Sequence, residues 1–192
     1  MSNRKKGKQQ DSTEVTGPYM IKEAAIKDDF CHYQYEVTDG TGFGDTHNVK
    51  GTGIVLNDMH HAFGKLNVHL ACIDDVFAHS NTDIDDIDKF HGHDLAALYH
   101  VTGIKIRGGK HNESVILVGS KHVNSSGGRI DLVTPKIPMD ELSSYKWKNE
   151  LKAAVDAIRE EVRLYKEGKY EKVLEEEVEN PRQLKITDNI EA

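Results

Sequence analysis

Basic side chains gather around two glycine pairs in the second half of the chain, at 108–109 and 127–128. The cations of this stretch are Lys105, Arg107, Lys110, Lys121, Arg129 and Lys136. The acidic residues between positions 98 and 136 are Glu113 and Asp131, so the stretch is locally positive in a chain of net charge −7. Lysine and arginine at this density are typical of a contact with a polyanion such as nucleic acid.

Aromatic residues lie close to these cations in the sequence. Strand alternation predicts that Lys105 and Arg107 share a face with Tyr99 and Val101. Trp147 stands between Lys146 and Lys148 at the expected start of the last helix. Single-stranded nucleic acid is bound by cations that follow its backbone and by rings that stack on its bases. The alternative is that these cations only keep an exposed sheet face in solution and that Trp147 belongs to the core.

A second group of residues could bind a metal ion. His91 and His93 follow four aspartates at 83, 85, 86 and 88, and imidazole with carboxylate is a common donor set for transition metals. The spacing does not fit a calcium loop, because its sixth position, counted from Asp83, is Asp88 and not glycine. A solvated acidic loop with surface histidines is the default interpretation, with a metal-dependent hydrolase as the alternative. No cofactor is expected.

Residues that could act as nucleophiles lack the usual surroundings. Cys72 lies near the apolar face of an expected helix, and Cys31 and His32 are neighbours in a strand, so they point to opposite faces. The glycine-rich segment 40–44 leads into a strand, whereas a phosphate-binding loop leads into a helix. The sequence therefore does not point to an enzyme.

The elements that must position these residues are six strands and two helices. Alternation and turn residues predict strands at 19–26, 30–37, 46–55, 98–107, 114–123 and 129–134. Apolar residues at spacings of four and three predict one helix face from Met59 to Phe77 and another from Leu151 to Tyr165. Asn57 is expected to cap the first helix, Ser143 or Ser144 the second, and Gly168 to end it.

The order strand-strand-strand-helix, present twice, predicts an α+β fold. Short turns favour an antiparallel sheet of about six strands, and the two amphipathic helices would pack on it. We expect a single domain over 18–173, with two similar halves at 18–80 and 95–170. A basic tail at 1–17 and an acidic tail at 174–192 are expected to be disordered.

Composition indicates a soluble protein of the cytoplasm. The chain of 192 residues has two cysteines, and no apolar run is long enough to span a membrane. The first residues are charged and lack the apolar region of a secretory signal.

Part of the chain resembles small proteins encoded by tailed phages and prophages. The residues that carry this resemblance are Val115-Ile-Leu-Val-Gly-Ser-Lys-His, Gly127-Gly-Arg129 and Ser144-Tyr-Lys-Trp-Lys-Asn-Glu-Leu. The element order is also similar to that of phage single-strand annealing proteins. That resemblance implies single-stranded DNA in a basic groove and assembly into rings. This chain departs from them in being short and acidic overall. The acidic tail is similar to those of phage single-stranded DNA-binding proteins, which recruit replication partners.

The resulting hypothesis is a phage-type accessory protein of DNA replication or recombination that binds single-stranded DNA without sequence preference. Phosphates would be bound by Lys105, Arg107, Lys110, Lys121 and Arg129, and Tyr99 and Trp147 would stack on bases. The alternative is a homo-oligomeric assembly or host-interaction module whose strand edges pair.

Overall fold

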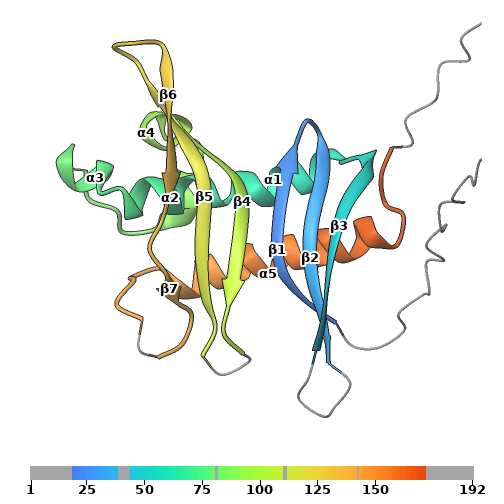
Figure 1. The fold of residues 1–192 in the computed structure, drawn as a ribbon. Coiled ribbons are helices and arrows are strands. Elements are labelled where there is room, and N and C mark those ends of the chain that lie inside the picture. Colours follow the sequence, from blue (N-terminus) through green and yellow to red (C-terminus); the bar gives the residue numbers. More distant parts are fainter. Residues whose placement is uncertain (1–18, 39–43, 81, 110–111, 142, 172–192) are drawn as a thin grey trace, which may run out of the picture.

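The computed structural model describes residues 19–38, 44–80, 82–109, 112–141 and 143–171 (Figure 1). The expected tails at 1–17 and 174–192 lie outside these ranges, and so does Lys110.

A single antiparallel sheet holds the two groups of three strands. Its strands are β1 (Tyr19–Lys27), β2 (Phe30–Thr38), β3 (Gly44–Ile54), β4 (Tyr99–Arg107), β5 (Ser114–Val123), β6 (Gly128–Val133) and the short β7 (Ile137–Pro138). The order across the sheet is β3-β2-β1-β4-β5-β6, and β7 pairs with β5. Consecutive strands pair antiparallel within each group, giving two meanders, and the pairing of β1 with β4 joins them. The predicted α+β class with an antiparallel sheet is confirmed.

Strands β1 and β4 pair over a short central stretch. Their register is Glu23 with Lys105, Ala24 with Ile104 and Ala25 with Gly103. Below this stretch the two strands diverge (Figure 1). The junction between the meanders is therefore the place where the sheet opens.

The helices cover one face of the sheet. They are α1 (Asn57–Gly64), α2 (Leu66–Ile73), α3 (Val76–His79), the 3₁₀ turn η1 (Ile87–Phe90), α4 (Asp94–Ala97) and α5 (Lys148–Lys166). Figure 1 shows α1, α2 and α5 crossing behind the strands. We call the opposite side of the sheet, which these helices leave uncovered, the open face. None of the helices in the described ranges is long and apolar enough to cross a membrane.

The first long helix of the sequence prediction is divided into three. Met59, Phe63, Leu66, Leu70 and Phe77 are buried as expected. The helix is interrupted at Lys65, directly after Gly64, because glycine is a poor helix former. It ends at Asp74, since Asp75 takes the left-handed conformation with φ of 55°. Asn57 is the first helical residue, and its side chain makes no cap hydrogen bond, so its predicted role as N-cap is wrong.

The last helix follows its predicted apolar face. Leu151, Val155, Ile158 and Val162 are fully buried, and each such side chain stabilises the fold by about 1.5–3 kcal/mol. The predicted start at Ser143 or Ser144 is wrong, because those residues belong to a preceding loop and Trp147 occupies the N-cap position. Gly168 has φ of 100°, which confirms its predicted place at the helix end.

Candidate nucleic-acid interface

A β-bulge in β4 decides which side of the sheet the basic residues occupy. The register with β5 shifts between Val101, opposite Gly119, and Gly103, opposite Val118. The extra residue reverses the alternation, so Ile104 and Ile106 are buried on the same side as Tyr99 and Val101. Lys105 and Arg107 point to the open face. The predicted shared face of Lys105, Arg107 and Tyr99 is therefore wrong.

Tyr99 and Lys121 are engaged on the helix side of the sheet. Tyr99 is 1% exposed, and its hydroxyl donates a hydrogen bond of 2.5 Å to Asp74 Oδ2. Lys121 Nζ lies 2.8 Å from the same oxygen and 5.1 Å from the centre of the Tyr99 ring. Burial raises the pKa of Asp74, but the hydrogen bonds from Lys121 and Tyr99 outweigh it and the net pKa is lowered. These contacts join the end of α2 to β4 and β5, so neither residue is available to a ligand on the open face.

Trp147 also lies in the helix layer. Its ring packs edge-on against Tyr145 with 6.0 Å between the ring centres, and Lys146 Nζ lies 4.6 Å from the Trp147 ring centre. Lys146 donates to the carbonyl oxygen of Ile84 at 2.7 Å. The expected stacking position of Trp147 is therefore on the opposite side of the sheet from Lys105.

The open face contains a groove over the centre of the sheet. The groove has a volume of about 890 Å³ and crosses β3, β2, β1 and β4. Side chains that line it include Lys27, His32, Gln34, Asn48, Lys50 and Lys105. His32 is the register partner of Lys50, and Gln34 donates a hydrogen bond of 2.7 Å to Asn48. We refer to this feature as the open-face groove.

The open-face groove has an excess of positive charge. Among the described residues Lys27, Lys50 and Lys105 have no ion-pair partner. Glu23 lies opposite Lys105 in the register, but its carboxylate binds Arg107 at 2.6 Å. Three lysines therefore face the groove with one carboxylate, and that carboxylate is already paired with an arginine.

Arg129 lies at the margin of the same face. It is exposed on β6 opposite His122, and strand alternation places both residues on the open face. Of the predicted phosphate-binding residues, the structure thus brings Lys105, Arg107 and Arg129 to one side and Lys121 to the other.

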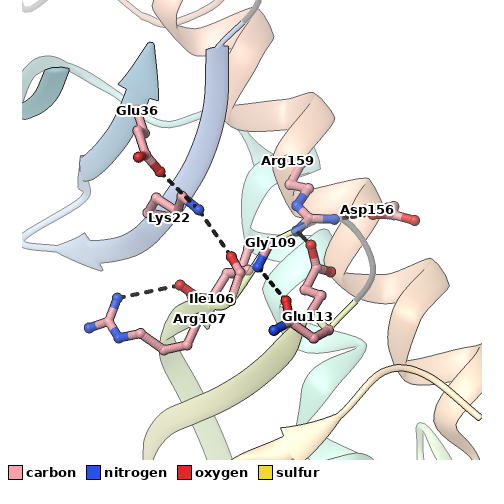
Figure 2. Close-up of polar contacts among 10 residues, drawn as sticks. Lys22, Glu36, Ile106, Arg107, Gly109, Glu113, Asp156 and Arg159 are labelled. Carbon is pink, nitrogen blue, oxygen red and sulfur yellow. Dashed lines mark hydrogen bonds and ion pairs between the residues drawn. The ribbon is translucent and has the colours of Figure 1, made fainter. Parts of the chain in front are cut away.

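A second cavity, of about 730 Å³, is lined by residues of β1, of the end of β4 and of α5. Figure 2 shows how its charges pair: Lys22 contacts Glu36 at 3.0 Å and the carbonyl oxygen of Gly108 at 3.2 Å. Arg159 contacts Glu113 at 2.5 Å and Asp156 at 2.7 Å (Figure 2). These pairs join β1 and α5 to the β4–β5 hairpin. They also neutralise Lys22 and Arg159, which weakens the attraction of this cavity for a polyanion.

The histidines of the 81–94 segment have local structural contacts. His91 lies 3.2 Å from Asp88, and His93 accepts a hydrogen bond of 3.1 Å from the Leu95 backbone N–H at the start of α4. Within the described ranges there is no group of three His, Cys, Asp or Glu side chains that could hold a metal ion. Burial raises the pKa of both Cys31 and Cys72 to about 12, so these thiols are protonated at neutral pH.

Lys27 and Lys50 were missed by sequence reasoning. They belong to the first meander, whereas the cations that lie close together in the sequence belong to the second. The available signal was Lys50 in a strand of exposed polar residues, but its distance from Lys105 along the chain gives no hint of a shared groove.

Scans against protein-family models, curated proteins and solved structures found no match to this chain.

Proposed function

We propose that this protein binds single-stranded DNA without sequence preference in the open-face groove. The observation that carries the proposal is the convergence of Lys27, Lys50 and Lys105 on one groove without an ion-pair partner among the described residues. An unpaired lysine can exchange its counterions for a phosphate, and the released counterions favour binding. The biological setting that fits is an accessory role in DNA replication or recombination of the phage type.

The form of the surface favours a single strand over a duplex. Reading a duplex in its major groove requires a helix or a two-stranded ribbon that projects from the protein. The centre of the open face is instead a groove in a sheet, with the amides of Gln34 and Asn48 and the ring of His32 in its lining. A single strand can lie along such a groove with its phosphates near the lysines and its bases over the sheet.

The proposed contact is mainly electrostatic. Tyr99 and Trp147 lie on the helix side and cannot stack on bases in the groove. Among the described residues of the proposed interface, only the ring of His32 is left to stack on a base. Three lysine–phosphate contacts on a single strand give a slope of log affinity against log salt of about −2. We therefore expect affinity to fall about 20-fold between 50 and 200 mM salt.

Fluorescence anisotropy with labelled single- and double-stranded oligonucleotides at these two salt concentrations tests the proposal. The variant Lys50→Glu with Lys105→Glu should bind the single strand at least tenfold more weakly and with a shallower salt slope. The matched control is Lys65→Glu with Lys152→Glu, which changes the net charge equally at exposed lysines of the helix layer. Equal losses in both variants, or no binding by the unmodified protein, would refute the proposed groove.

A further inference from the structure

No strand of the described ranges pairs with the outer edge of β6. β6 ends the sheet, and its exposed residues include Ile130 at 53% and Val133 at 67%, the largest exposures among the large hydrophobic side chains of the described ranges. Exposed edge strands pair readily with another strand unless their sequence prevents it.

The backbone of β6 identifies which groups are free to pair. The Thr134 backbone N–H donates to the Leu117 carbonyl oxygen at 3.0 Å, so residue 134 faces β5. Alternation then directs the N–H and C=O groups of Leu132 and Ile130 to β5 as well. The corresponding groups of Arg129, Asp131 and Val133 face outward. The outward residues thus include one cation and one anion, two positions apart.

This charge pattern is self-complementary in one antiparallel register. We propose that two copies of this chain associate through their β6 edges, with Ile130 opposite Ile130 of the second copy. In that register Arg129 lies opposite Asp131 of the second copy, and Asp131 lies opposite its Arg129. Both are positions whose backbone groups face outward, so each pair exchanges two hydrogen bonds. Shifting the register by one repeat places Asp131 opposite Asp131, or Arg129 opposite Arg129, and like charges across a strand pair are destabilising.

The other edge of the sheet is less suited to the same contact. At β3 the end of the strand is already occupied, because Ile54 and Glu171 exchange two backbone hydrogen bonds of 3.0 Å. Side chains of Tyr165 and Tyr170 lie so close to Gly51 and Gly53 that no side chain fits at either glycine. The exposed apolar residues Ile130 and Val133 are on β6.

The association has a consequence for the open-face groove. The two-fold axis of an antiparallel edge contact is perpendicular to the sheet, so the open faces of both copies lie on the same side. The two grooves would then share one continuous surface. The edge contact itself does not depend on the proposed DNA binding.

Sedimentation velocity over a concentration series, on protein freed of nucleic acid, tests the edge contact directly. The unmodified protein should form dimers in the range up to about 100 μM. Arg129→Asp and Asp131→Arg should each weaken the dimer about tenfold or more, because two attractive pairs become repulsive. A monomeric unmodified protein across this range would overturn the proposal.

A mixing experiment separates the charge pairing from a loss of folding. Equal amounts of Arg129→Asp and Asp131→Arg should form heterodimers, since every acidic position then meets a basic one. The double variant Arg129→Asp with Asp131→Arg should dimerise as the unmodified protein does. The control Asp45→Arg, on the β3 edge, should leave the dimer unchanged. Failure of mixing and of the double variant to restore dimers, or disruption by Asp45→Arg, would contradict the β6 contact.

Discussion

The two faces of the sheet carry lysines of neighbouring strands in opposite electrostatic surroundings. On the helix side Lys121 forms an ion pair of 2.8 Å with Asp74, which neutralises its charge. On the open face Lys105 has no ion-pair partner among the described residues, and Lys27 and Lys50 share this condition. A count of cations along the chain therefore does not locate a binding surface. The positions of the acidic partners decide it.

The largest effect is expected from a change that exchanges the two faces of β4. Insertion of one alanine between Gly103 and Ile104 would move all later residues of β4 by one position and direct Lys105 and Arg107 towards the core. Burying these charges without partners should cost more than about 4 kcal/mol of unfolding free energy, so no cooperative unfolding transition should remain. Urea unfolding followed by circular dichroism measures this.

The matched control for the insertion is Thr102→Ser, which keeps the length of β4. Its unfolding midpoint should stay close to that of the unmodified protein. An insertion variant with an unchanged midpoint would show that β4 takes up the added residue without turning Lys105 and Arg107 inward.

A smaller loss of stability is expected when low pH protonates His69 on the helix side. His69 is 1% exposed and contacts the Tyr145 hydroxyl at 2.9 Å, and burial, with a contribution from His91, lowers its pKa to about 3. The unfolded chain therefore binds the proton more readily, so His69 contributes full stability above pH 6.5 and loses it as the pH falls towards 3. The loss is about 1.4 kcal/mol per pH unit, or about 2 kcal/mol between pH 6.5 and 5.

Urea unfolding at pH 7, 6 and 5 isolates this contribution when His69→Gln is measured beside the unmodified protein. The variant is expected to be less stable at pH 7 but to lose less stability on acidification. Parallel pH profiles for the two proteins would show that His69 does not titrate in this way.

The smallest effect is expected from breaking the ion pair of Lys121 with Asp74, which Lys105 lacks within the described ranges. Asp74→Asn removes the charge that holds Lys121 and Tyr99, and a charge-assisted pair about one-third exposed is worth about 1–2 kcal/mol. Thermal unfolding should shift down by a few degrees, while affinity for single-stranded DNA stays the same. If Asp74→Asn instead gains as much affinity for single-stranded DNA as the variant Lys50→Glu with Lys105→Glu loses, the binding surface lies on the helix side.

Much of the local structure could be predicted from residue patterns. Alternation located β5 at Ser114–Val123 and the other long strands within two residues at each end. The same reasoning failed at β4, because the bulge depends on pairing with Gly119 and Val118 across the strand and not on the β4 residues alone. It failed at the first helix because the spacing of Met59, Phe63 and Leu66 describes a buried face equally well in one helix or in two.

The residues that line the candidate groove could be predicted only in part. Lys105, Arg107 and Arg129 were identified and lie on the open face, whereas Tyr99, Lys121 and Trp147 lie on the helix side. Lys27 and Lys50 could not be found, since they reach the groove only through the order β3-β2-β1-β4.

The amino-acid sequence by itself determined the elements of this protein, because helix and strand periodicity are properties of neighbouring residues. It also determined the local excess of cations. Only the tertiary structure decided which cations are neutralised, since Asp74 and Lys121 meet through the packing of α2 on β5, and which lysines from distant segments share a groove. Electrostatic partners act over a few ångströms in space, and separation along the chain does not limit them.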